Sequence, residues 1–199
     1  MKSNNKNSAE QYFNQKDFSV IEIILLIAAV ISVFVMIFVR GGIPMGLPIF
    51  AVCAVVLCVI RSFKVKDSEI DQLLDKIIQD NNIERAETVI ECYDLKNTSV
   101  KKRKEGKVIS PKYCITNIKF SSDVTVFTVY NIDLINQTVE KTIHTVACND
   151  KITLTEETVR TNVGSVAISY IDFDGFTIPV TLKEYKTAEL VQKVCDRHN

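Results

Sequence analysis

Two long apolar runs near the N-terminus constrain the fold of this chain more than any other feature. Residues 18–39 hold one charged side chain, Glu22, and residues 43–60 hold none. A helix rises about 1.5 Å per residue, so the first run crosses a hydrocarbon core about 30 Å thick, and the second crosses it when nearly upright. The sequence therefore predicts two transmembrane helices, over 18–39 and 43–60.

The short interval between the runs and the charges outside them predict the topology. Arg40-Gly41-Gly42 allows only a tight turn, so the two helices form an antiparallel hairpin. Most flanking cations lie outside the hairpin: Lys2, Lys6 and Lys16 before it, and Arg61, Lys64 and Lys66 after it. Because cytoplasmic flanks carry the excess of Lys and Arg, we expect a cell-membrane protein with two spans and both termini in the cytoplasm. A cleaved signal peptide is disfavoured, because the first run is too long and a second follows at once.

Glu22 is the one ionisable residue inside the first predicted span. Such residues are functional candidates, although this one lies about one turn from the cytoplasmic edge, where its carboxylate can reach the headgroups. The sequence leaves its role open. Small residues predict a helix-packing face within or beyond the hairpin: Ala28, Ala29, Ser32, Ala51 and Ala54.

Charge is distributed unevenly although the whole chain is neutral. Residues 1–66 hold seven Lys or Arg against three Asp or Glu, whereas residues 67–199 hold seventeen against twenty-one. An acidic soluble part argues against nucleic acid as a partner, because phosphates require a basic face. The six cysteines include no Cys-x-x-Cys pair, and we expect reduced, mostly buried thiols.

The remaining segments predict an α+β domain outside the membrane. Residues 1–17 read as a disordered polar tail, and residues 61–83 as a juxtamembrane linker with an amphipathic helix over 67–83, capped by Asp67 or Ser68. Residues 84–199 predict a cytoplasmic, mostly antiparallel β-rich domain, a meander or small barrel, with a C-terminal helix that Thr187 caps. Seven strands are expected, over 86–95, 112–121, 124–131, 138–147, 151–160, 164–171 and 175–182.

Seven strands followed by a helix is the element order of pleckstrin-homology-like (PH-like) domains. The segment Tyr113-Cys114-Ile115-Thr116-Asn117 resembles the second-strand pattern of bacterial PH-like domains, many of which are fused to membrane spans. The resemblance covers residues 84–198. The chain departs from the family where Ile118 separates Asn117 from Lys119, and where the last helix lacks a Trp. The alternative is another small β-rich or α+β fold.

A run of cations between the first two long strands is the candidate binding site. It comprises Lys101, Lys102, Arg103, Lys104 and Lys107. The resemblance implies that this loop contacts lipid headgroups, and each cation near an anionic surface contributes about 1 kcal/mol. The alternative is a solvated loop whose charges prevent sheet-to-sheet association.

Other polar residues do not predict a catalytic or metal site. His144 and Cys148 are four residues apart on a predicted strand, about 13 Å, too far for a dyad. His198 falls in a frayed C-terminus, and Asp172-Phe173-Asp174-Gly175 lacks later calcium ligands, so it predicts a hairpin turn. No cofactor is expected.

The sequence favours a non-enzymatic binding module anchored in the lipid bilayer by two helices. Its β-rich domain would bind anionic lipid headgroups or a partner protein, including another membrane protein or a second copy of itself. The alternative is an accessory or scaffolding subunit of a larger membrane transport or secretion complex. An enzyme whose site the sequence does not reveal is the least favoured hypothesis.

Overall fold

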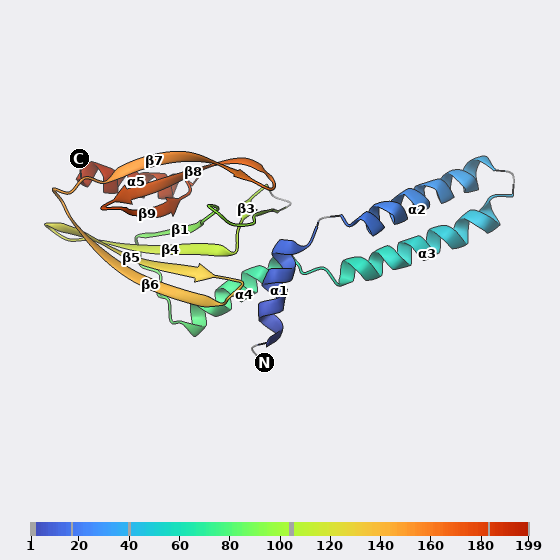
Figure 1. The fold of residues 1–199 in the computed structure, drawn as a ribbon, viewed down its shortest axis with the longest axis horizontal. Helices are drawn as coiled ribbons and strands as arrows, with labels where there is room; N and C mark the ends of the chain where they lie inside the picture. Colours follow the sequence, from blue (N-terminus) through green and yellow to red (C-terminus); the bar gives the residue numbers. More distant parts are fainter. Residues whose placement is uncertain (1–2, 17, 40, 104–105, 183, 199) are drawn as a thin grey trace. The chain divides into compact units, whose positions relative to one another are not determined.

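The computed structural model describes residues 3–16, 18–39, 41–103, 106–182 and 184–198. It is an α+β chain with helices near the N-terminus and antiparallel sheets after them, as the sequence predicted. The chain divides into two compact units (Figure 1). One is Asn14–Lys66, and the other combines Met1–Phe13 with Asp67–Asn199.

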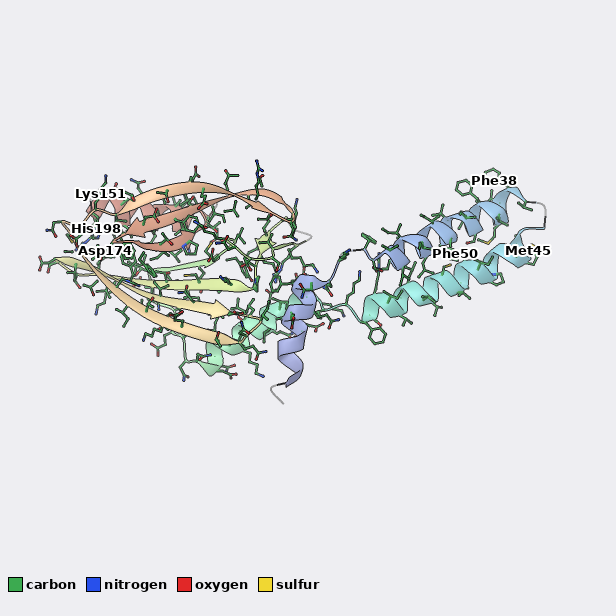
Figure 2. The ribbon with its side chains drawn as sticks, viewed as in Figure 1. Phe38, Met45, Phe50, Lys151, Asp174 and His198 are labelled. Atoms are coloured by element: carbon green, nitrogen blue, oxygen red, sulfur yellow. The ribbon has the colours of Figure 1, made fainter. Side chains whose placement is uncertain are left out.

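The first unit is the predicted hairpin, formed by α2 (Val20–Phe38) and α3 (Ile43–Ser62). Both helices are long and apolar enough to cross a membrane, by length and composition. Figure 2 shows Phe38 and Met45 near the turn that joins them. Ser19 begins α2 with a capping box, in which its hydroxyl accepts from the Glu22 N–H and the Glu22 carboxylate accepts from the Ser19 N–H.

Small residues let the two helices of the hairpin approach closely. Ser32, Gly46 and Cys53 are buried between them. A Cβ on Gly46 would lie 2.6 Å from the Ser32 carbonyl oxygen and 2.5 Å from Met36 Cγ. Of the predicted packing face, Ser32 is buried and Ala28, Ala29 and Ala54 are half-buried within the hairpin, whereas Ala51 is exposed.

The N-terminal segment is a helix, α1 (Ser3–Asn14), and the prediction of a disordered tail is wrong here. Its last turns bury Ala9, Tyr12 and Phe13. The sequence missed it because only contacts with residues far along the chain stabilise it. Tyr12 Oη donates to Asp67 Oδ1 at 2.6 Å.

Helix α4 (Asp67–Asp80) has the predicted amphipathic face, with Ile70, Leu73, Leu74, Ile77 and Ile78 buried. It starts at Asp67 rather than after it, and ends three residues earlier than predicted. Asn82 adopts a left-handed φ of 49°, which Asn tolerates and which a helix does not continue through.

All seven predicted strands are present. A four-stranded antiparallel sheet has the order β1 (Val89–Tyr93), β4 (Lys112–Phe120), β5 (Val124–Asp133), β6 (Thr138–Ala147). A three-stranded antiparallel sheet has the order β7 (Thr153–Thr161), β8 (Gly164–Phe173), β9 (Phe176–Val180). A short hairpin, β2 (Lys101–Lys102) with β3 (Val108–Ile109), lies within the basic segment.

The core lies between the two sheets and is covered by α5 (Tyr185–Arg197). Phe127 of β5 stacks on Phe173 of β8 with ring centroids 4.9 Å apart. Helix α5 buries Val191, Val194 and Cys195 in the same cluster. Its N-cap is Glu184 rather than the predicted Thr187. β1 and β9 lie beside each other without pairing, so the two sheets approach at this side.

The cysteines behave as predicted. All six are free, and Cys53, Cys92, Cys114 and Cys195 are buried. Cys92 and Cys114 lie directly opposite each other on β1 and β4.

Candidate functional site

Two cations of the basic segment have partners inside the β-rich unit. Arg103 makes a bidentate pair with Asp71 of α4, at 2.7 and 3.1 Å. Lys101 Nζ lies 4.2 Å from the centre of the Tyr12 ring and 3.3 Å from the Tyr12 carbonyl oxygen. Burial and the hydrogen bond to Asp67 raise the pKa of Tyr12 above its ordinary value. Lys101 and Arg103 therefore help to hold α1 and α4 in place.

Of the other cations in the basic segment, the structure describes Lys102 and Lys107. Lys102 and Lys107 are exposed, and Lys107 Nζ lies 5.8 Å from the centre of the Tyr93 ring. Lys104 lies outside the described residues. The described part of the segment therefore forms a short hairpin with cations facing different partners, rather than a single free basic patch.

Sequence reasoning missed a groove of about 550 Å³ between the start of β1 and α5. Its walls come from segments about a hundred residues apart in the chain. The strand side contributes Glu87, Thr88, Val89 and Glu91, with Tyr113 and Lys107 beside them, and the helix side contributes Glu184, Lys186, Thr187, Glu189, Leu190 and Lys193. This is an ordinary size for a ligand site in a protein.

Val89 and Glu91 of β1 line this groove. In an antiparallel pair, alternate residues direct their N–H and C=O groups to the partner strand. The bonds from the Ile118 N–H to the Thr88 carbonyl and from the Asp94 N–H to the Lys112 carbonyl show which β1 residues face β4. By alternation, Val89 and Glu91 direct their backbone groups away from β4. Within the described chain, these groups have no hydrogen-bond partner.

The groove carries charges of both signs. The Glu91 carboxylate accepts from Arg85 and, at 2.9 Å, from Tyr113 Oη. Lys193 lies 4.9 Å from the centre of the Phe120 ring. The groove residues that are exposed without a described ion-pair partner are Glu87, Glu184, Glu189, Lys107, Lys186 and Lys193. Three carboxylates against three ammonium groups leave these exposed charges balanced.

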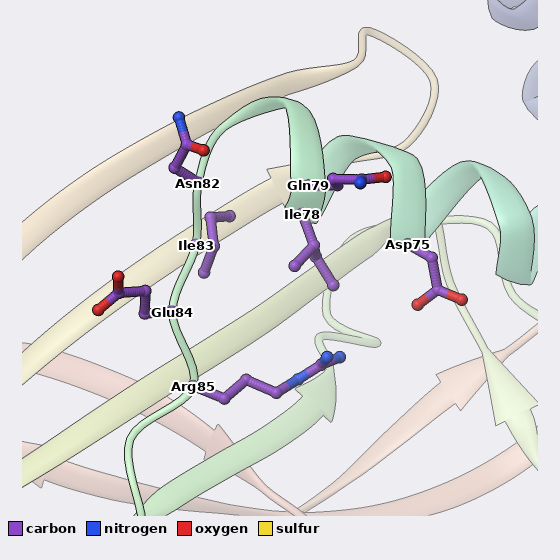
Figure 3. A pocket seen from close by; sticks show the side chains of 7 residues that line it. All are labelled: Asp75, Ile78, Gln79, Asn82, Ile83, Glu84 and Arg85. Atoms are coloured by element: carbon purple, nitrogen blue, oxygen red, sulfur yellow. The ribbon is translucent and has the colours of Figure 1, made fainter.

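A second hollow lies at the end of α4. Figure 3 shows it lined by the last turn of the helix and the segment that follows, from Asp75 to Arg85. The Arg85 guanidinium is paired with Glu91, outside the hollow's own lining.

Glu22 is part of a cluster of polar contacts at the base of the hairpin. Its side chain is buried, with Lys64 Nζ at 2.7 Å and Arg61 Nε at 3.7 Å. The Gln15 side-chain amide both donates to the Val65 carbonyl oxygen at 2.8 Å and accepts from the Val65 N–H at 3.1 Å. These contacts join the segment entering α2 to the segment leaving α3, which accounts for a carboxylate in an otherwise apolar helix.

The histidines occupy structural positions. His144 stacks on Phe176 at 3.8 Å, while Cys148 Sγ lies 3.7 Å from the Ser122 carbonyl oxygen, so the two form no dyad, as predicted. The prediction of a frayed end is wrong for His198. Its Nε2 lies 2.8 Å from Thr125 Oγ1 and its Nδ1 lies 3.1 Å from the Asp150 carbonyl oxygen, which fixes the end of α5.

The predicted turn at Asp174-Gly175 is present, with φ of 44° and 74°. It joins β8 to β9 directly, since Phe173 pairs with Phe176. Figure 2 shows Asp174, Lys151 and His198 at the same end of the β-rich unit. In the described residues no three His, Cys, Asp or Glu side chains gather as a metal-binding group.

Comparisons by family model, by curated protein and by solved structure find no match to this chain. The groove along β1 combines a strand wall, a helix wall and charges of both signs.

Proposed function

We propose that the chain is a membrane-anchored, non-enzymatic binding module. The α2–α3 hairpin crosses the membrane, and the β-rich domain binds a partner protein through the groove between β1 and α5. The observation that carries this proposal is the groove of about 550 Å³ that β1 and α5 line.

The exposed apolar side chains of the hairpin support membrane insertion. Only 17% of the most apolar stretch of α2 is buried within the structure. Both helices expose Ile, Val, Leu or Phe along their lengths, such as Ile31 on α2 and Val52 on α3. A core helix of a water-soluble protein buries such residues, whereas lipid tails solvate them. The positive flanks then favour both termini in the cytoplasm.

The element order supports a PH-like fold for the β-rich domain. Four strands pair in one sheet, three pair in the next, and a helix covers the core between them. The connections between the seven long strands involve no crossover. This is the order that the resemblance of Tyr113–Asn117 implies.

The contacts of the basic segment favour a protein over anionic lipid as the ligand. Arg103 and Lys101 are engaged by Asp71 and Tyr12, and a lipid phosphate would have to compete with these contacts. The groove beside Lys107 carries charges of both signs and backbone groups that suit a polypeptide.

The packing of the hairpin bears on the alternative of an accessory subunit. Helices that associate in lipid do so through small residues. Ser32, Gly46 and Cys53 are already used between α2 and α3. The outward faces instead carry bulky Ile, Val and Phe side chains, which favours contact with lipid.

In-cell photo-crosslinking tests this function. A photoreactive residue replaces Thr187 in the groove, and in a control it replaces Glu140, which is exposed on β6. We expect a discrete crosslinked protein in the membrane fraction from position 187 and none from position 140. No crosslink from either position would overturn the proposal, as would crosslinking to the same proteins from both.

A further inference from the structure

We propose that β7 pairs edge to edge with β7 of a second copy of this chain, antiparallel and with Thr158 on the two-fold axis. This inference goes beyond the proposed function, because β7 contributes no residue to the groove. Three observations carry it: a backbone edge without hydrogen-bond partners, the lack of features that protect such an edge, and charges that complement themselves across a two-fold axis.

The pairing of β8 with β9 shows which side of β8 faces β7. The tight turn that joins β8 to β9 makes Phe173 and Phe176 a hydrogen-bonded pair. Backbone groups alternate between the two sides of a strand, so Tyr170 directs its N–H and C=O away from β9 and toward β7. The residue opposite Tyr170 on β9 is Pro179, which has no N–H to donate, in agreement with this assignment.

The same alternation identifies the unpaired backbone groups of β7. Thr155 lies opposite Tyr170 and therefore exchanges hydrogen bonds with β8. β7 is the outer strand of its sheet, and its other edge has no strand paired to it (Figure 1). The residues that direct their N–H and C=O groups to that edge, with no hydrogen-bond partner in the described parts of the chain, are Leu154, Glu156, Thr158 and Arg160.

Strand β7 lacks features by which monomeric proteins protect an exposed edge. Its register against β8 runs without interruption from Thr153 to Thr161, so it carries no bulge, and it contains no Pro. Residues 154–158 are exposed, and Leu154 keeps 41% of its surface accessible. Bulges, prolines and short length are the usual means of preventing edge association. The edge of β7 is therefore open to a further strand.

The charges on this edge complement themselves. Glu156 and Arg160 are exposed, have no ion-pair partner among the described residues, and lie two positions on either side of Thr158. Two β7 strands paired antiparallel about an axis at Thr158 place Glu156 of each copy directly opposite Arg160 of the other. Opposite charges directly across an antiparallel pair stabilise it. The symmetry gives two such pairs from one strand sequence, as an isologous interface requires.

The neighbouring registers lack this match. Hydrogen bonding requires that outward-directed residues pair with outward-directed residues, so the axis moves in steps of one residue. With Glu157 on the axis, Glu157 lies opposite itself, and like charges oppose pairing. With Val159 on the axis, Glu156 lies opposite the turn that follows β7 rather than opposite Arg160. The Thr158 register is thus selected by charge, and it fits a second copy of the same strand.

Oxidative crosslinking of the full chain in membranes tests the register. Thr158→Cys places two thiols opposite each other, at a Cα separation of about 5.5 Å that a disulfide spans. The control is Leu154→Cys, exposed on the same strand, where the two copies lie about 26 Å apart. Both variants also carry Cys58→Ser, because Cys58 is an exposed native thiol. We expect a disulfide-linked dimer of the chain from position 158 and none from position 154.

Charge reversal and its rescue test the contacts. The dissociation constant of the dimer is measured by light scattering over a dilution series of the full chain in detergent micelles. Glu156→Arg sets two arginines opposite each other in each half of the interface and should raise this constant at least tenfold. Adding Arg160→Glu to the same chain exchanges the two charges and should restore it to within threefold of the parent. Glu140→Arg, on β6, should leave it unchanged, and circular dichroism should match the parent for every variant.

Four results would overturn the inference. They are a parent chain that is monomeric throughout the series, equal crosslinking from positions 154 and 158, a double variant that dimerises no better than Glu156→Arg, and a crosslink from position 158 to a different protein. A partner protein crosslinked from position 187 does not depend on β7. The proposed function therefore stands or fails separately from this inference.

Discussion

The two units of this chain place the same kinds of side chain in opposite positions. In the β-rich unit, Ile, Val and Phe lie inside, as Phe127 and Ile171 do. In the hairpin, the same residue types lie outside, while Ser32 and Gly46 lie between the helices. Apolar burial stabilises the first unit in water, and close packing of small residues brings the helices of the second together, as the proposed insertion in lipid requires. This difference is what the proposed membrane insertion of the hairpin predicts.

Truncating a core aromatic residue should give the largest effect. Phe127→Ala removes a fully buried ring that stacks on Phe173, which costs about 3–5 kcal/mol in a core. Phe34→Ala in the hairpin removes an exposed ring and should leave the stability of the β-rich unit unchanged. Urea unfolding of both variants in detergent measures the difference. Equal destabilisation would break the distinction between the units.

A charge on the outer face of the hairpin should change membrane insertion, whereas a charge on the surface of the β-rich unit should not. A lysine at a helix centre costs about 3 kcal/mol in membrane insertion, so Val30→Lys combined with Val52→Lys should move the chain out of the membrane fraction. Leu154→Lys, at an exposed apolar position on β7, is the control and should leave fractionation unchanged. Retention of the doubly charged hairpin in membranes would count against lipid contact at these positions.

Filling the space between the helices should have a smaller effect. Gly46→Leu forces its Cβ against Met36 and the Ser32 carbonyl, and overpacking of this kind costs about 1–3 kcal/mol. Ala51→Leu adds the same side chain on the exposed face of α3 and is the matched control. Thermal loss of helical circular dichroism in detergent should occur at a lower temperature for Gly46→Leu only. Equal melting would show that Gly46 is not at a close contact.

Removing the cap of α2 should be milder still. Ser19→Ala deletes the side chain that accepts from the Glu22 N–H, which costs about 1 kcal/mol at a helix N-terminus. Ser62→Ala, near the end of α3, removes an exposed hydroxyl that contacts only the Val59 carbonyl oxygen and serves as the control. The same melting experiment should rank Ser19→Ala between Gly46→Leu and Ser62→Ala.

The free energy of unfolding of the β-rich unit should fall as the pH rises above neutrality. Burial raises the pKa of the Cys114 thiol to about 11. The unfolded chain loses this proton first, so the stabilising contribution is complete below the ordinary thiol pKa and is lost as pH rises toward about 11. Urea unfolding across this range should show falling stability, and Cys114→Ala should reduce the slope. An unchanged slope in the variant would assign the effect to other groups, such as Tyr93, whose pKa burial raises to about 12.

The elements were predictable where the signal is local. The apolar runs predicted α2 and α3, and alternation with Asp174-Gly175 predicted the strands and the last hairpin. The sequence did not predict α1, because Tyr12 is ordered by Asp67 and Lys101, far along the chain. It also did not predict the end of α5, which the contact of His198 with Thr125 fixes.

The candidate site was the least predictable part. The basic segment stands out in the sequence, yet Arg103 and Lys101 turn out to hold neighbouring helices. The groove depends on which edge of β1 is unpaired and on where α5 lies, and neither follows from local pattern. Only the register of β1 on β4 reveals that Val89 and Glu91 face outward.

Retention of the full chain in membranes after an alkaline carbonate wash tests the account most directly. Peripheral proteins dissolve under this treatment, whereas chains that cross the lipid remain until detergent is added. Because α2 and α3 expose apolar side chains along their lengths, we expect the chain in the pellet after the wash and in the soluble fraction after detergent. Recovery in the aqueous wash would contradict the account.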